Sequence, residues 1–454
     1  MGTAIASGYS RREPEKSILH KLVRDNLETL LAESRSEDGA GLPAFVEREL
    51  REYSKCGLLS EGFTLLRCTK CGEEIPVAFS CKTKICPSCA ARRMHSVSLD
   101  LGARLPVVPY RHWVLSLPPH LRFLLARDER LLSRFRKLFA SSVRSFLRRK
   151  AKALGVRSPL TGAIVFTQRF SSKLLLYPHF HAVVPDGAFS LAGDGKPVFH
   201  ALRPSQDDVE QVAASIAKKA ARLQARLDLD AQDPNDLDRL RARAAQGELA
   251  LKLGLEERPP PRLLASREGF TLQAARHLHA NDREGLAFLI RYNLRPPIAL
   301  SRLAELPSGK VLLTFKRPLA DGTAALELAP IALLRRLASL VPPPGAHDLS
   351  YFGIYSSHDA HRRLFVGPRR KDPDHCQAHP GLEAHDSELQ VQPTNPDALV
   401  ADTIEEERYV RWADLMRKVH GLEALIDKER AGLWRRSGGD PLAAVSVIHR
   451  VPAG

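Results

Sequence analysis

The sequence predicts an α+β fold, in which a helical, cysteine-rich N-terminal part precedes a larger part that holds helices and paired strands. Three observations support this prediction. Apolar residues recur at helical spacing in several segments, and shorter apolar runs lie close enough together to form hairpins. Six of the seven cysteines lie between residues 56 and 89. The 454 residues leave room for about two to four domains.

The N-terminal half alternates helical and strand patterns around the cysteines. Residues 17–31 and 44–53 carry apolar residues among charges at helical spacing, which predicts two amphipathic helices. After the cysteines we predict a strand over 113–117 that ends at Pro118, a basic amphipathic helix over 128–153, and strands over 163–170 and 179–184 that form a hairpin.

The C-terminal half also contains both helical and strand patterns. Residues 205–255 are charge-rich and predicted to be helical. The later predicted elements are a strand near 270–275, a helix over 282–293, a hairpin over 310–328, a helix over 330–340, a strand over 349–355 and a helix over 404–418. Asn281 and Glu284 fit a capping box for the helix that begins at 282. Beyond Phe365, the Pro, His, Asp and Gln content is typical of a linker.

The composition argues against a disordered or membrane-spanning protein and favours one that binds nucleic acid. Lys and Arg number 68 against 52 Asp and Glu, a net charge of +16, and the 44% hydrophobic content excludes wholesale disorder. No apolar run approaches the ~18 residues of a membrane span. Arg11 and Arg12 are followed by charged residues rather than an apolar stretch, so we expect no export. We expect a cytoplasmic protein that binds nucleic acid and no membrane.

Two CxxC pairs predict a metal site. Cys68 and Cys71 are separated by fourteen residues from Cys86 and Cys89. A CxxC turn brings two thiolates close enough to share one zinc ion, and a second turn completes a closed, structural tetrahedron. Nearby basic residues such as Arg92 and Arg93 could face phosphates.

Cys56 and Cys81 are harder to assign from the sequence. They could be thiols in the outer shell of the zinc site, alternative zinc ligands or core residues. The sequence pattern favours the core assignment slightly.

A second metal site is predicted at His179-Phe180-His181. Strand alternation puts both imidazoles on one face and Phe180 on the other. Two such imidazoles can hold a metal ion and leave positions open for phosphate oxygens, although HxH alone more often marks a structural pair. If the hairpin closes through 171–177, Gln168 lies opposite and could be the third ligand; a surface-facing role is equally well supported.

Tyr292 is the candidate nucleophile, near the end of a short helix and flanked by Arg291 and Arg295. A phenol, with an ordinary pKa near 10, is a weak nucleophile at neutral pH. Neighbouring cations favour the phenolate. By itself, a tyrosine between arginines usually marks the boundary of an amphipathic helix.

These motifs together resemble one family. The N-terminal motifs resemble the zinc-binding domain of insertion-sequence-91 type transposases: Gly62-Phe63, the CxxC pairs, Phe79–Lys82 and Cys86–Arg93. The later motifs are similar to the transposase domain of that family: Trp113–Pro118, Gln168–Phe170, Pro178–His181 with Asp186-Gly187, Arg291-Tyr292 with Arg295–Pro297, and Tyr351–Gly353. The resemblance follows the order of the chain and covers roughly residues 15–365.

The resemblance implies an HUH endonuclease with a central antiparallel sheet flanked by helices, after a zinc-ribbon-like N-terminal domain. Such an enzyme nicks single-stranded DNA at the ends of a mobile element, forms a 5′-phosphotyrosine and supports rolling-circle transposition in bacteria, near the nucleoid. His179 and His181 match the ligands of Mg²⁺ or Mn²⁺, and Tyr292 matches the nucleophile. The predicted DNA contacts are Arg92, Arg93, Arg169, Arg291 and Arg295.

The predicted domains are a zinc- and DNA-binding domain over 15–107, a catalytic domain over 108–365 with a helical insertion at about 205–262, a linker over 366–403, and a C-terminal helix and tail over 404–454. Twelve Lys or Arg and two acidic residues lie between Arg122 and Arg157. This imbalance predicts a DNA track from the zinc module along that helix to the histidine pair.

Two departures from the family pattern stand out. Phe288 occupies the position where two-tyrosine members carry a second tyrosine, which implies a single-tyrosine variant, and residues 420–454 hold no cysteine for a further CxxC segment. The alternatives are a plasmid replication initiator or relaxase, a catalytically decayed zinc-dependent DNA-binding protein, and a zinc-ribbon scaffold.

Overall fold

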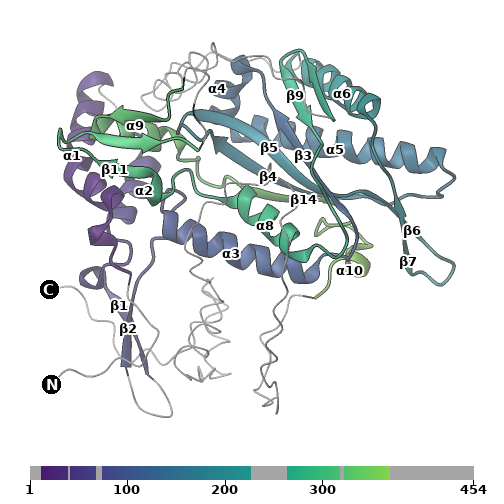
Figure 1. Cartoon of the computed structure of the whole chain (residues 1–454), viewed down its shortest axis with the longest axis horizontal. Helices are drawn as coiled ribbons and strands as arrows, with labels where there is room; N and C mark the ends of the chain where they lie inside the picture. The colour runs from purple at the N-terminus through teal and green to yellow at the C-terminus, as the bar shows by residue number, and fades with distance from the viewer. Residues whose placement is uncertain are drawn as a thin grey trace.

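A seven-stranded antiparallel sheet forms the centre of the part of the chain that the structure describes (Figure 1). The strand order is β14-β4-β5-β3-β9-β8, and β10 adds a short pair on β3. The bounds are β3 Tyr110–Ser116, β4 Gly162–Phe170, β5 Leu176–Pro185, β8 Leu264–Arg267, β9 Phe270–Gln273, β10 His277–Leu278 and β14 Leu349–Gly353. The expected hairpin of β4 and β5 is confirmed, and β5 lies inside the sheet between β4 and β3.

The computed structural model describes residues 12–38, 41–67, 74–225, 263–316, 318 and 322–368. The helix predicted at 404–418, most of the predicted linker and the second half of the predicted insertion lie outside these residues. Among the described helices, none combines the length and the apolar character needed to cross a membrane.

Helices cover both faces of the sheet, so the α+β prediction is confirmed. One face packs on α4 Pro119–Arg127, α5 Glu129–Ala153 and α6 Gln206–Gln224. The other face packs on α3 Pro87–Arg104 and α8 Arg283–Leu294, which run side by side below the sheet in Figure 1. α5 forms because Phe135, Phe139 and Phe146 recur along one side, where each is buried.

The N-terminal helices form a second core with a segment from the far end of the chain. α1 Ile18–Asp38 and α2 Ala44–Ser54 pack with α9 Pro330–Leu340 and a three-stranded sheet of β11 Leu303–Glu305, β12 Val311–Thr314 and β13 Ala325–Leu328. Leu333 and Leu337 of α9 are buried in this core beside Val23 and Leu27 of α1. The segment that we placed within the catalytic domain therefore shares the core of the N-terminal part.

Several elements differ from those predicted. The sequence patterns missed α3, α4, β8, β10 and β11. They also missed two hairpins, β1 Phe63–Arg67 with β2 Glu74–Ala78 and β6 Gly187–Leu191 with β7 Pro197–Ala201. Short turns of helix also occur: η1 Pro14–Lys16, η2 Leu59–Glu61, η3 Leu300–Arg302 and α10 Arg362–Phe365. The capping box expected at Asn281 is wrong, because Asp282 caps α8 by accepting a hydrogen bond from the Gly285 N–H at 2.8 Å.

Candidate active site and metal centre

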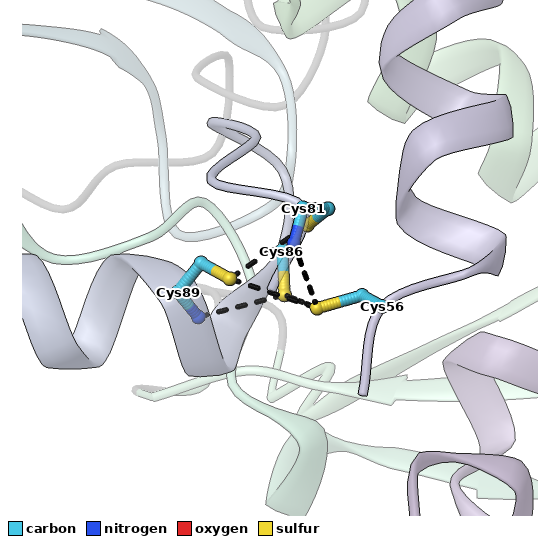
Figure 2. Close-up of side chains that lie close together, drawn as sticks. All are labelled: Cys56, Cys81, Cys86 and Cys89. Atoms are coloured by element: carbon cyan, nitrogen blue, oxygen red, sulfur yellow. Dashed lines mark hydrogen bonds between the residues drawn. The ribbon is translucent and has the colours of Figure 1, made fainter. Parts of the chain in front are cut away.

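Four cysteine sulfurs converge where α2, the segment after β2 and the start of α3 meet (Figure 2). Their ligand atoms all lie within 4.8 Å of one another: Cys56, Cys81, Cys86 and Cys89. The sulfur–sulfur distance is 3.6 Å from Cys56 to Cys89, and it is 3.7 Å from Cys56 to Cys86 and from Cys81 to Cys89. Tetrahedral zinc with Zn–S bonds of about 2.3 Å separates its sulfurs by about 3.8 Å, so the cluster fits a closed structural zinc.

Positive groups surround this cluster. Cys86 is the N-cap of α3, and its sulfur accepts a hydrogen bond from the Cys89 N–H at 3.5 Å. Arg12 donates to the Cys56 carbonyl at 2.8 Å and to its sulfur at 3.3 Å. Hydrogen bonds from neighbouring thiols, that of Cys81 foremost, lower the pKa of Cys56. The helix N-terminus and the guanidinium both favour the thiolates that zinc requires.

This ligand set differs from the one predicted from CxxC spacing. Cys56 and Cys81, favoured as core residues, join Cys86 and Cys89, while Cys68 and Cys71 fall between β1 and β2, outside the described residues. A backbone hydrogen bond of 2.9 Å from the Gly57 N–H to the Phe79 carbonyl brings the two segments together. Gly57 makes the sharp turn after Cys56 with φ of +81°, which favours glycine. The sequence signal that could have identified Cys56 as a zinc ligand was the glycine directly after it.

The histidine pair lies on β5 as predicted. Phe180 points to the opposite face and stacks on Phe139 of α5. The imidazoles point toward α8, where the His181 ring lies 6.1 Å from the Tyr292 ring and nearly perpendicular to it. On the neighbouring strand β4, Gln168 pairs directly opposite His179. The strand register therefore brings Gln168 beside the histidines, and the packing of α8 adds Tyr292.

Hydrogen bonds leave ligand atoms of this cluster free. His179 Nδ1 donates to the Tyr177 carbonyl at 2.7 Å, which leaves Nε2 as the lone-pair nitrogen. His181 Nδ1 lies 3.0 Å from His112 Nε2, and the buried His181 Nε2 has no hydrogen-bond partner among the described residues. Gln168 Nε2 donates to the Tyr292 and Asn293 carbonyls at 3.1 and 3.0 Å. Its buried Oε1 also lacks a partner in the described part of the chain.

These atoms suit a divalent cation. Burial lowers the pKa of His179 to about 4 and that of His181 well below its ordinary value. The imidazoles are therefore neutral at pH 7, which is the form that binds metal. Mg²⁺ typically takes only oxygen ligands, whereas transition metals such as Zn²⁺ and Cu²⁺ favour imidazole nitrogens. A ligand set of two nitrogens and one amide oxygen is intermediate, so Mn²⁺ fits better than Mg²⁺.

His112 on β3 is a site residue that the sequence patterns did not reveal. Its ring stacks on His181 with centroids 5.1 Å apart, and burial lowers its pKa to about 3. A His181 that binds metal through Nε2 carries its proton on Nδ1, so the neutral His112 accepts that proton's hydrogen bond and sets the orientation of the ring. The position of His112 directly before Trp113 gave no hint of this contact.

We expect His112→Leu to weaken Mn²⁺ binding by about 10–100-fold, because the hydrogen bond that orients His181 is lost. His112→Gln retains an amide oxygen as acceptor and should keep most of the affinity. Titration of Mn²⁺ followed by electron paramagnetic resonance measures both variants. Equal Mn²⁺ affinity in the wild type and His112→Leu would show that His112 does not position the ligand.

Aromatic and cationic side chains line the exposed side of α8. Tyr292 is 36% exposed, and the Arg295 guanidinium lies 4.5 Å from its ring centroid. Phe288, one turn earlier, is 40% exposed beside Arg276 at 5.5 Å. Arg276, which the sequence patterns did not reveal, also helps to lower the pKa of His112 after the larger effect of burial. Exposed rings beside guanidinium groups are the kind of surface on which bases stack and phosphates bind.

Two family models match the chain. A "Transposase zinc-binding domain" of the insertion-sequence-91 type covers residues 25–117, and a "Putative transposase" family covers residues 162–363. These matches confirm the expected resemblance to the insertion-sequence-91 type transposases, with the zinc-binding domain ahead of the transposase domain. A curated relative, the "Putative transposase y4qJ" of Sinorhizobium fredii, is 22% identical over 320 residues, which are 70% of this chain and 76% of the relative. No solved structure matches the chain significantly.

The five arginines predicted to contact DNA differ in exposure and in surroundings. Arg92 is exposed on α3, Arg93 and Arg295 are half-buried, and Arg291 lies near His95 of α3, whose pKa is lowered by burial and then by this arginine. Arg169 is 6% exposed and pairs with Glu129 of α5 at 2.5 Å. The prediction that Arg169 contacts DNA is wrong, since alternation after Gln168 sends it to the other face of the sheet.

The predicted DNA track cannot run from α5 directly to the histidine pair. α5 packs on the sheet face that holds Phe180, whereas His179 and His181 face α8. The sheet therefore separates the basic helix from the candidate active site.

Proposed function

We propose that this transposase nicks single-stranded DNA at element ends as a single-tyrosine HUH endonuclease, for rolling-circle-type transposition. One observation carries the proposal: Tyr292 lies against His181, whose buried Nε2 has no hydrogen-bond partner among the described residues. The buried Oε1 of Gln168 likewise has no partner among them. The zinc centre favours a transposase over a plasmid replication initiator or relaxase.

The chemistry follows from the residues around Tyr292. A divalent cation held by His179, His181 and Gln168 would polarise the scissile phosphate. The Tyr292 oxygen attacks phosphorus and loses its proton to solvent, and the bond to the 3′ oxygen breaks. The products are a 5′-phosphotyrosine and a 3′-OH that takes up a proton. Arg295, over the Tyr292 ring, offsets the negative charge of the phenolate and phosphate.

Gln168 acts in two ways in this scheme. Its amide N–H groups donate to the carbonyls of Tyr292 and Asn293 at the end of α8, while its buried oxygen has no partner among the described residues and would serve as a metal ligand. It therefore ties the nucleophile's helix to the strand that supports the metal ligands. Phe288 lacks a hydroxyl, so Tyr292 alone forms the covalent link on α8.

The test is formation of a covalent protein–DNA adduct. The full chain is incubated with Mn²⁺ and labelled single-stranded oligonucleotides that tile the DNA flanking its gene, and adducts are resolved on a denaturing gel. We expect a Mn²⁺-dependent adduct that Tyr292→Phe abolishes and that Tyr351→Phe, at another exposed tyrosine, retains. An adduct that survives Tyr292→Phe, or DNA binding without any adduct in the wild type, contradicts the proposal.

A further inference from the structure

We propose that the exposed side of α5 binds a DNA duplex. This side of the molecule lies across the central sheet from Tyr292. This surface, the α5 stripe, consists of six exposed basic residues: Arg130, Arg134, Lys137, Arg148, Arg149 and Lys152. All except Arg149 recur at intervals of three, four or eleven residues, so they lie on one side of the helix. The opposite side of α5 is the apolar one, packed on the sheet.

The length of the stripe matches a segment of DNA backbone. From Arg130 to Lys152 it spans about 33 Å, at ~1.5 Å per residue. One strand of a duplex carries about ten phosphates over this distance, at ~3.4 Å each. The straight helix therefore presents its cations along a stretch of backbone about one turn long.

The acidic groups near the stripe are engaged elsewhere. Asp128 caps α5 by accepting from the Arg130 and Leu131 N–H groups at 2.7 and 3.0 Å. Glu129 pairs with Arg169 at 2.5 Å, and Asp208 of α6 pairs with Lys150. In the described part of the chain, no ion pair involves a residue of the stripe. An external polyanion is thus the partner that its charge fits.

Crowding of cations supports the same conclusion. After the larger effect of burial, Arg148 lowers the pKa of Arg144 and Arg149 lowers the pKa of Lys219 on α6. Like charges around the stripe repel one another, and bound phosphates would relieve this repulsion.

The absence of exposed aromatic rings among the described residues of α5 favours duplex DNA over single-stranded DNA as the partner of the stripe. Surfaces that bind single strands combine cations with exposed aromatic rings that stack on bases. Phe135, Phe139 and Phe146 of α5 are all buried, so the stripe offers charge alone. Two exposed rings, Phe288 and Tyr292, lie on the other side of the sheet. One molecule would therefore hold a duplex on α5 and a single strand at α8.

The test compares two triple variants of the full chain. Arg130→Gln/Arg134→Gln/Arg148→Gln removes three charges from the stripe, and Lys21→Gln/Lys196→Gln/Lys310→Gln removes three exposed charges elsewhere. Binding of a labelled 40-base-pair duplex of random sequence is measured by fluorescence anisotropy at several salt concentrations. We expect the stripe variant to lose at least about tenfold in affinity near 0.1 M salt. The slope of log Kd against log salt should fall by about 1 for each phosphate-binding cation removed.

The outcomes are distinct. Equal affinity and slope for the two triple variants would overturn the proposal, as would a loss confined to single-stranded DNA. Formation of the Tyr292 adduct on short single-stranded oligonucleotides should persist in the stripe variant, since the sheet lies between the two surfaces. Absence of the adduct in the wild type would count against the nicking mechanism and leave the duplex measurement unaffected.

Discussion

Replacing Cys56 by serine should release the structural zinc and destabilise the N-terminal part of the protein. Serine is a poor zinc ligand, and the remaining sulfurs of Cys81, Cys86 and Cys89 leave the tetrahedron incomplete. Apparent binding free energies of structural zinc are about 10–16 kcal/mol in zinc-finger peptides, so losing one ligand is a large effect. Zinc measured by elemental analysis should fall from about one ion per chain toward none, and the thermal midpoint should drop.

Cys68→Ser is the matched control. Cys56, Cys81, Cys86 and Cys89 already complete a four-sulfur site, so this variant should keep its zinc. Retention of zinc in Cys56→Ser together with its loss in Cys68→Ser would restore the ligand set expected from CxxC spacing.

The zinc should also influence the active site through α3. Cys86 and Cys89 lie at the start of α3, and Leu101 and Leu105 at its other end share a core with Leu289 of α8. α8 carries Tyr292. We therefore expect Cys56→Ser to lower adduct formation as well, although Cys56 lies outside the cluster at Tyr292.

His181→Ala should abolish Mn²⁺ binding and the covalent adduct while leaving the zinc in place. Loss of a direct ligand costs more than the ~10–100-fold that loss of an outer-shell partner costs. His181 is not part of the four-cysteine cluster, so elemental analysis should still find zinc. Mn²⁺ titration and the adduct gel measure the two losses separately.

Stability must be checked in this variant. His112 Nε2 loses its partner at 3.0 Å, and an unsatisfied buried polar atom costs about 1–3 kcal/mol. A thermal midpoint near that of the wild type would show that the site, rather than the fold, has failed. Wild-type Mn²⁺ affinity in a folded His181→Ala would exclude His181 as a ligand.

Much of the candidate site was predictable because it depends on local periodicity. Alternation along one strand puts His179 and His181 on a common face whatever the rest of the chain does. The short connection after β4 restricts the register, so Gln168 could be expected opposite the pair, as observed. Helical spacing likewise predicted α5 and the helix of Tyr292.

The remaining site residues depend on contacts between distant segments, which periodicity does not encode. His112 meets His181 because β3 pairs with β5 across 69 residues. Cys56 and Cys81 meet through a backbone hydrogen bond between the segments that carry them. Spacing rules favour ligands that are close in sequence, and for that reason they selected Cys68 and Cys71.

The sequence by itself determined the class of protein: a basic chain with a cysteine-rich N-terminal module, an HxH strand, a tyrosine between arginines and an α+β fold. The tertiary structure decided which sulfurs gather, which atoms of the histidine cluster stay open and on which side of the sheet the basic helix lies. The reason is physical. Residue type and period set what one element can bury, whereas the pairing of strands and the packing of helices set what each buried or exposed group finally meets.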